Sequence, residues 1–197
     1  MALQKSSLNF TAFQRLESLL ESSLEDASGR LSAYAQRFLC IHVHATSELD
    51  VERLVESPGF GWRYGDLVRV GFEGPCRGDL VLSLTHQAAN QLANVLLGDD
   101  LAPSEEDDVE GRVLAEMECA QILAYTFLRE LSLATGATFF PRPSEFLQDM
   151  AASLIQRTVR ELDSLWQAEL QMQTDQRTLN CHVALALSPE LLQLLGT

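Results

Sequence analysis

Two segments of the sequence, about 100 residues apart, share one pattern in which a strand is followed by a helix. The first is LVLSLTHQAANQLANVLLG at 80–98, and the second is HVALALSPELLQLLG at 182–196. In each, apolar residues alternate over a strand-like run that passes directly into a leucine-rich helical run ending at glycine. The repeat predicts a duplication within one domain covering 1–197, with pseudo-repeats at about 10–98 and 106–197.

The remaining patterns predict an α+β fold in which duplicated helix-strand units place long helices on a shared antiparallel sheet. Turn residues separate the runs, and Gly98 is a suitable residue to follow a helix end. The predicted helices are 10–36, 48–55, 86–98, 108–134, 143–163 and 189–196, and the predicted strands are 37–45, 67–72, 79–85, 137–140, 167–173 and 179–187.

The 108–134 helix carries one apolar stripe that we expect to be buried. Glu116, Cys119 and Leu123 are predicted to lie to one side of this stripe. Its members are Val113, Met117, Ala120, Ala124, Phe127, Leu128 and Leu131.

Composition and charge exclude several classes of function. The chain has 28 acidic against 14 basic residues, a formal net charge of -14, which repels nucleic acid and anionic lipid. It contains no run of ~18 apolar residues that would span a membrane. The first residues, MALQKSSLNF, lack the apolar segment of a signal peptide, so a cytoplasmic protein is predicted.

No cofactor or metal site is predicted. The four cysteines form no CxxC pair, which indicates neither a disulfide framework nor a zinc site. His42 and His44 share one face of a strand, but no third ligand lies nearby in the sequence. GxSxG, HExxH and Walker motifs are absent as well.

The acidic segment GDDLAPSEEDDVEGR at 98–112 has two interpretations. A run of like charges is most often a solvated linker. The alternative is an acidic rim beside the following helix that attracts a lysine of a partner.

The segment LAEMECAQILAYTFLRELSLATGATFFPRPSEFLQDMAASLI at 114–155 places Glu116 and Cys119 on a long helix, with Pro141 following 22 residues after the cysteine. This arrangement resembles the bacterial chemotaxis phosphatase family of CheC, CheX and FliY. The segment at 78–98 likewise resembles the strand and helix that precede the acidic linker in that family.

Two of the four motif positions of the family match in the second half of the chain. The first position, Asp or Ser in the family, falls on Arg112, the glutamate on Glu116, the asparagine on Cys119 and the proline on Pro141. In the first half, the two plausible registers give the pairs Ser18/Glu21 or Leu19/Ser22, and neither contains an asparagine.

The resemblance implies a partner, a phosphorylated CheY-type receiver domain, contacted through Arg112 and Glu116. In the family the glutamate meets a lysine of the receiver, and the asparagine orients the water that attacks the aspartyl phosphate. A thiol is a weak donor and a weak acceptor, so Cys119 replaces that carboxamide poorly. The implied aspartyl-phosphate phosphatase activity at Glu116 and Cys119 is therefore weak or absent.

The sequence also allows alternatives to this site and this function. Glu118 and Gln121 form a second acid-x-x-amide pair, pointing roughly 200° away from the Glu116/Cys119 direction. Cys119 is a small residue at the flank of the helix, a motif residue whose role has changed, or a redox-sensing thiol. The chain could also be a non-enzymatic interaction module on the same scaffold, including one that self-associates as a homodimer through a sheet edge.

Overall fold

The computed structural model describes residues 2–49, 65–98, 109–147, 164–175 and 177–196. These residues form an α+β domain in which helices and antiparallel strands follow one another along the chain. The elements are α1 (Ala2–Ala35), β1 (Leu39–Leu49), β2 (Gly65–Glu73), β3 (Gly78–Thr85), α3 (His86–Leu97), α4 (Val109–Thr135), β4 (Phe140–Leu147), β5 (Ser164–Thr174), β6 (Thr178–Leu187) and α6 (Pro189–Gly196).

The strands form one six-stranded antiparallel sheet in the order β1-β5-β6-β3-β2-β4. The hairpins β2–β3 and β5–β6 meet in the middle, where β3 pairs with β6. Each outer strand joins the hairpin from the other part of the chain, because β1 pairs with β5 and β4 pairs with β2. A duplicated chain would produce this order, since exchanging the corresponding strands of the two halves leaves it unchanged.

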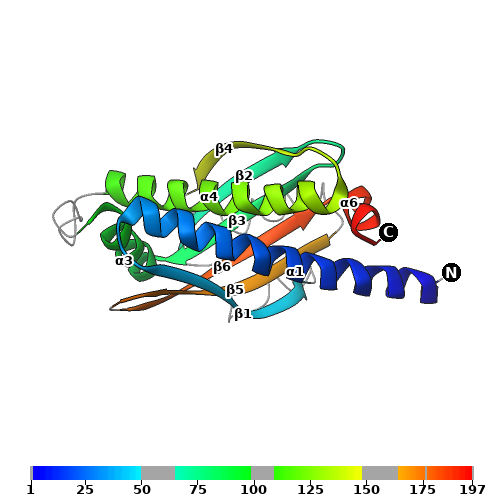
Figure 1. Cartoon of the computed structure of the whole chain (residues 1–197), viewed down its shortest axis with the longest axis horizontal. Coiled ribbons are helices and arrows are strands. Elements are labelled where there is room, and N and C mark those ends of the chain that lie inside the picture. Colours follow the sequence, from blue (N-terminus) through cyan, green and yellow to red (C-terminus); the bar gives the residue numbers. More distant parts are fainter. Residues whose placement is uncertain (1, 50–64, 99–108, 148–163, 176, 197) are drawn as a thin grey trace.

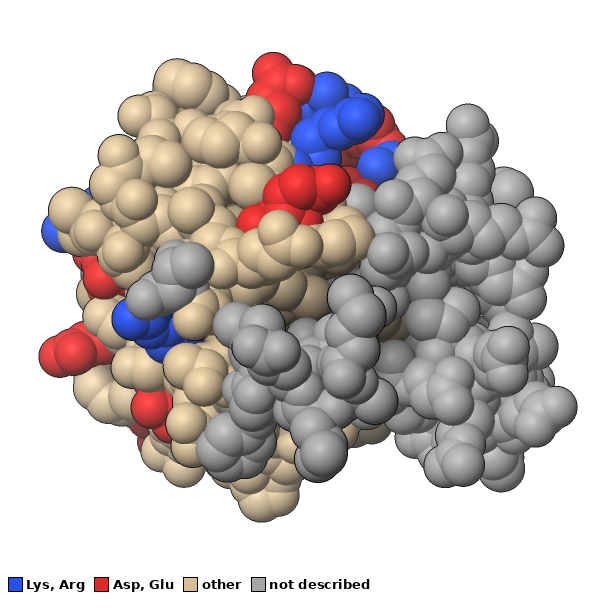
Figure 2. Space-filling view, turned by 90° about the vertical axis from the view of Figure 1, so that its right-hand side faces the viewer, with Lys and Arg blue, Asp and Glu red and all other residues tan. Residues whose placement is uncertain are grey.

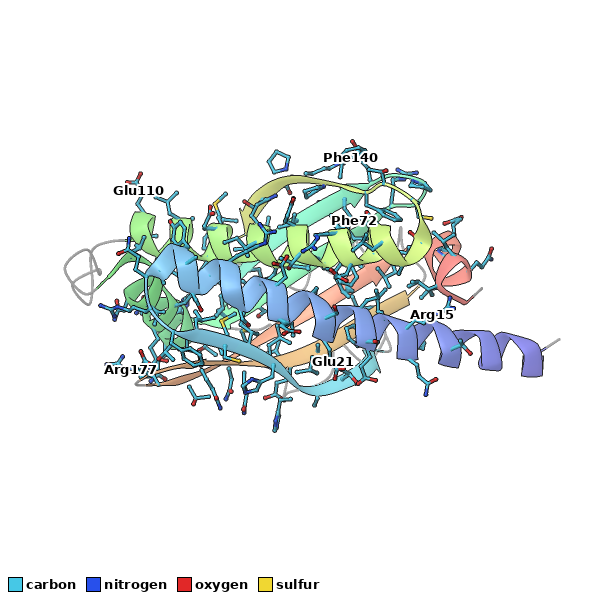
Figure 3. All side chains as sticks on the ribbon, viewed as in Figure 1. Arg15, Glu21, Phe72, Glu110, Phe140 and Arg177 are labelled. Carbon is cyan, nitrogen blue, oxygen red and sulfur yellow. The ribbon has the colours of Figure 1, made fainter. Side chains whose placement is uncertain are left out.

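The two long helices cross one face of the sheet side by side and run in opposite directions (Figure 1). Leucines on α1 that recur at helical spacing, including Leu16, Leu20 and Leu24, are almost fully buried beneath it. Arg15 lies toward the α6 end of the molecule (Figure 3), where its Nη1 donates a hydrogen bond of 2.9 Å to the carbonyl oxygen of Leu195. Side chains from α1, α4 and the covered sheet face thus make up one core.

Most of the predicted elements are present. Thr85 caps the start of α3 by accepting a hydrogen bond from the Ala88 N–H, and Gly98 follows its end with φ of 85°. The left-handed region occupied by Gly98 is one that glycine enters without steric cost, as the sequence indicated. The predicted 108–134 helix corresponds to α4, which ends just before Gly136.

Two predicted helices are wrong where the structure describes them. Residues 140–147 form strand β4, so the predicted helix at 143–163 does not begin there; its remainder lies outside the described residues. Residues 48–49 belong to β1 rather than to a helix at 48–55, and the rest of that segment is also outside the described part. Main-chain pairing of Phe140–Leu147 with β2 overrides the local pattern that predicted a helix here.

The predicted stripe on α4 is confirmed at its later positions, whereas its first two positions are only partly buried. Ala120, Phe127 and Leu131 are fully buried, but Val113 and Met117 are intermediate. Glu116 and Cys119 have no exposed surface at all, and Leu123 is 3% exposed. The buried face of α4 is therefore rotated toward the two motif positions, which lie against the sheet.

Candidate functional site

The buried face of α4 places two carboxyl groups around a single guanidinium. Arg112 and Glu116 are one turn apart on α4, and Asp66 faces them from β2. The Arg112 Nε lies 3.1 Å from Asp66 Oδ2 and 3.6 Å from Glu116 Oε1. Asp66 is 1% exposed and Glu116 is 0% exposed, so we call these three residues the buried cluster.

Glu116 is neutral in this setting. Burial raises its pKa to about 9, aided by the nearby Asp66 carboxylate, while the charge of Arg112 opposes the shift. Two carboxylates facing one arginine would leave an unpaired buried charge, and protonation of Glu116 removes it. The cluster thus consists of one ion pair, between Arg112 and Asp66, and one neutral carboxyl, that of Glu116, beside it.

Helix α3 joins the buried cluster through two side chains. His86 Nδ1 lies 3.3 Å from Asp66 Oδ2, and the Asn90 carboxamide oxygen accepts a hydrogen bond of 3.5 Å from Arg112 Nη1. Asp66 comes from β2 and Arg112 from α4. Together with His86 and Asn90 of α3, they connect β2, α3 and α4. Such an arrangement suits structural positioning better than contact with a partner.

Cys119 does not present a reactive thiol. It is 0% exposed, and burial raises its pKa well above the ordinary value, with further contributions from Cys181, Glu116 and Glu118. A nucleophilic or redox-sensing cysteine needs an accessible thiolate. The environment of Cys119 disfavours both features, and all four cysteines of the chain are free.

Pro141 lies at the start of β4, opposite Phe72 of β2. It lines an apolar groove of about 590 Å³ between the end of α4 and the beginning of β4. Leu133 and Phe140, which also line the groove, are 68% and 60% exposed. The structure therefore places Pro141 at the far end of α4, away from Arg112 in the first turn of that helix.

The outward face of α4 carries a different set of side chains. Leu114, Glu118 and Tyr125 are exposed on this face, whereas Gln121 is half-buried. On the neighbouring α1, Ser18 and Glu21 are exposed, and Glu21 is labelled in Figure 3. Of the two candidate pairs on α4, Glu116/Cys119 and Glu118/Gln121, the second offers a carboxylate that a partner can reach.

An exposed group of charges links α1 and α4 on this side. Asp26 accepts hydrogen bonds from Arg30 Nε at 3.1 Å and from Arg129 Nη1 at 2.8 Å. The Arg30 guanidinium also lies over the Tyr125 ring, 5.0 Å from its centroid. We call Asp26, Arg30 and Arg129 the outer cluster.

At the opposite end of the molecule, acidic and basic side chains lie next to one another (Figure 2). Arg142 Nη2 lies 2.6 Å from Glu73 Oε2, and Arg69 Nε lies 2.8 Å from Asp79 Oδ1. These pairs border a groove of about 1230 Å³ between the β2–β3 turn and α6. Arg69 and Arg142 of this groove are therefore already paired with carboxylates, which weakens their attraction for an anion.

Within the described part of the chain, no group of three or more metal-binding side chains is arranged to hold a metal ion. No helix in that part is long and apolar enough to cross a membrane.

Comparison with solved structures shows which known proteins have a similar fold. No protein-family model and no curated protein matches the sequence. FliY from Thermotoga maritima superimposes with a TM-score of 0.68 at 17% identity, covering 91% of each chain. The chain has a CheC/FliY-like fold.

Two further structures with the CheC/FliY-like fold are chains of complexes with different partners. A chain of the FliG-FliM complex from H. pylori has a TM-score of 0.66 at 12% identity, covering 92% of this chain and 97% of that one. A chain of the CheX-CheY complex with BeF3 and Mg2+ from Borrelia burgdorferi has a TM-score of 0.53 at 15% identity, covering 84% and 96%. The fold thus occurs in proteins solved with two different partners.

Sequence reasoning missed Asp66, His86 and Asn90 as parts of the cluster. One signal was available for Asp66, because in β2 it has the same parity as Val68 and Val70, which face the core. An acid on the apolar side of a strand requires a buried cation, and Arg112 is that cation. Nothing in the local sequence of α3 points to the other two residues.

Proposed function

We propose that this chain is a chemotaxis-type protein that binds a phosphorylated CheY-type receiver through the outward face of α1 and α4, with weak or absent phosphatase activity. The CheC/FliY-like fold supports the class of partner. One observation carries the prediction of weak activity: the motif-equivalent Glu116 is fully buried beside Asp66 and Arg112. A receiver cannot meet this carboxyl without displacing α4 from the sheet.

The roles predicted for Arg112, Glu116 and Cys119 at a receiver's phosphate remain predictions. Their burial favours the alternative pair Glu118 and Gln121 for any contact made by α4. The exposed side chains of Leu114 and Tyr125 lie on the same face and provide apolar anchors for a partner surface. In this proposal Glu118 offers the carboxylate that meets a lysine of the receiver.

The test measures binding of a CheY-type receiver with and without BeF3 and Mg2+, which together mimic its phosphate. Leu114→Ala and Tyr125→Ala should each weaken binding of the mimic-bearing receiver by about tenfold, the effect of truncating an anchor residue. Phe38→Ala is the matched control, because Phe38 and Leu114 are both 57% exposed and Phe38 lies beside α3 instead. Binding that both anchor variants leave unchanged would remove this face from the proposal.

A second candidate function is a non-enzymatic module that joins a larger assembly. The TM-score with a chain of the FliG-FliM complex, 0.66 against 0.53 for a chain of the CheX-CheY complex, favours it. The same binding measurement separates the two candidates. Equal affinity for the receiver with and without the phosphate mimic, or no binding at all, favours the assembly module.

A further inference from the structure

A second site lies between α3 and the beginning of β6, away from the outward face of α1 and α4. It is a pocket of about 340 Å³, and the residues that line it are Ser83, Thr85, Gln87, Ala88, Gln91, Thr178, Leu179, Asn180 and His182. Hydroxyls, carboxamides and one imidazole dominate this lining. Among the described residues that line it, none is Asp, Glu, Lys or Arg.

Two polar atoms in this pocket are buried without a partner. Ser83 is 1% exposed, and its Oγ has no hydrogen bond within the described part of the protein. The same is true of Nδ1 of His182, which lies directly opposite Ser83 across the β3–β6 ladder. An unmade hydrogen bond at a buried polar group costs about 1–3 kcal/mol, so a partner from outside the chain is expected at this position.

The pair is not arranged for catalysis. Since Ser83 Oγ has no hydrogen bond, no base activates it as a nucleophile. Glu169 lies on the other side of His182 in the same row of the sheet, which superficially completes a serine-histidine-acid order. Because Ser83 Oγ makes no hydrogen bond within the described part of the protein, we interpret Ser83 and His182 as groups that bind a ligand.

The charge of the site selects the ligand. Burial lowers the pKa of His182, with a partial opposing effect from Glu169, so the imidazole is neutral near pH 7. A charged ligand would lose hydration here without finding a counter-charge in the lining. An apolar ligand would leave Ser83 and His182 unpaired.

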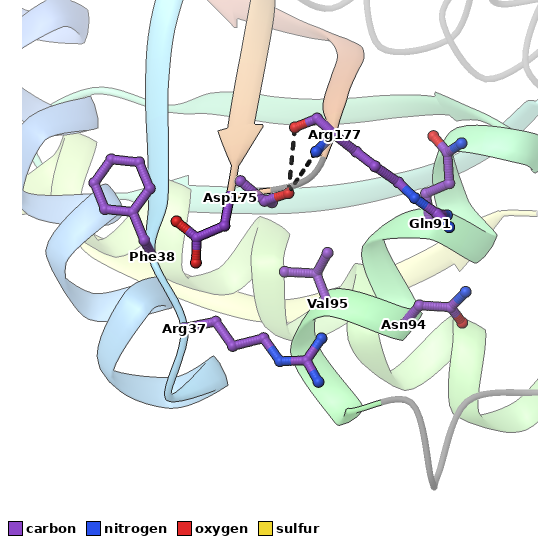
Figure 4. A pocket seen from close by; sticks show the side chains of 8 residues that line it. Arg37, Phe38, Gln91, Asn94, Val95, Asp175 and Arg177 are labelled. Carbon is purple, nitrogen blue, oxygen red and sulfur yellow. Dashed lines mark hydrogen bonds between the residues drawn. The ribbon is translucent and has the colours of Figure 1, made fainter.

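The neighbouring pocket provides the contrast (Figure 4). It has about 320 Å³ and shares Gln91 with the first, but charged side chains line it, among them Arg37, Asp175 and Arg177. The two pockets therefore occupy adjacent parts of the α3 surface and differ mainly in charge.

We propose that the pocket formed by Ser83, His182 and Asn180 binds a small, neutral, polyhydroxylated molecule of the monosaccharide or cyclitol class. Hydroxyl groups both donate and accept, which matches an unpaired serine hydroxyl, an imidazole and the carboxamides of Gln87 and Asn180. The volume suits a ligand of this size. The site is independent of the receiver-binding proposal.

The experiment titrates the ¹⁵N-labelled full chain with D-glucose and myo-inositol and follows its amide resonances by NMR. Glucose 6-phosphate and protonated glucosamine serve as charged analogues. We expect saturable shifts confined to residues around 83–88 and 178–182 with the neutral probes, and weaker effects with both charged analogues. Larger shifts with either charged analogue, or no saturable shift with any probe, would overturn the proposal.

Asn180→Ala should weaken binding of the neutral probes about three- to tenfold, the usual effect of one hydrogen bond. Asn94→Ala is the matched control, since Asn94 is also a carboxamide near Gln91 but lines only the charged pocket (Figure 4). Asn180 is exposed, so its truncation should leave the fold intact. The sugars could also stabilise the Asn180→Ala and Asn94→Ala variants equally and cause no localised NMR shifts. That result would reflect general exclusion of sugar from the protein surface and would contradict a site.

Discussion

The two sides of α4 carry clusters of similar composition with opposite physical outcomes. The buried cluster has two carboxyls for one arginine, and burial keeps Glu116 neutral. The outer cluster has one carboxylate for two arginines. Burial alone would raise the pKa of Asp26, but the hydrogen bonds and charges of Arg30 and Arg129 together outweigh it, so this pKa is lowered. The charges of the buried cluster are enclosed by the fold, whereas those of the outer cluster are exposed to solvent.

The largest expected effect comes from removing the cation of the buried cluster. Arg112→Met leaves the Asp66 carboxylate buried without its ion-pair partner, which should lower the free energy of unfolding by about 3–5 kcal/mol. Denaturant unfolding measures this change. The double variant Asp66→Asn/Arg112→Met should recover part of the loss, and a loss below about 1 kcal/mol in the single variant would contradict the ion pair.

A smaller effect is expected at Cys119. Cys119→Asn restores the motif residue of the family but buries a carboxamide where a fully enclosed thiol stood, at a cost of about 1–3 kcal/mol if it finds no partners. Because the side chain points into the core, we expect no gain in dephosphorylation of a receiver. The decay rate of receiver phosphate at equal protein concentration tests this, and a clear acceleration would show that α4 turns outward in the complex.

The pH dependence of stability tests the neutral state of Glu116. Its folded pKa of about 9 lies above the ordinary glutamate value of 4.5, so Glu116 ionises in the unfolded chain first as the pH rises. The stability associated with the neutral carboxyl is fully present below about pH 4.5 and is lost progressively up to about pH 9. Glu116→Gln should remove a slope of at most about 1.4 kcal/mol per pH unit from the unfolding free energy. Parallel pH profiles for the two proteins would argue that Glu116 is ionised.

The smallest effect is expected on the outer side. Arg129→Ala removes an ion pair whose arginine is 49% exposed, so stability should change by about 1 kcal/mol or less because solvent screens the charges. Denaturant unfolding alongside Arg112→Met gives the comparison directly. A loss at Arg129 as large as that at Arg112 would erase the distinction between the two clusters.

The sequence specified the elements with strong periodicity and left the site uncertain. Alternation in β2, β3 and β6 and the leucine spacing of α1 depend on local pattern, which is visible in one sequence. The segment at 143–147 was misassigned because its pairing with β2 is a tertiary effect that local propensity does not contain.

The orientation of Glu116 was not predictable by the same reasoning. A glutamate on a helix is normally solvated, so nothing local indicates that this one is buried. Its environment depends on Asp66, which comes from a distant strand, and on Arg112, whose guanidinium lies near both carboxyls. The motif spacing points to α4, but the face of α4 that meets solvent follows from packing against the sheet.

Pro141 and Pro143 affect how readily the β4 edge of the sheet can pair with a strand of another molecule. Both lie in β4, the last strand of the described sheet on that side, and two prolines two residues apart remove two main-chain donors from it. Prolines in sheets are confined largely to such outer strands, where they discourage edge-to-edge pairing. Any partner or second copy that extends the sheet by strand addition is therefore directed away from β4, and fibre-like growth through that border is suppressed.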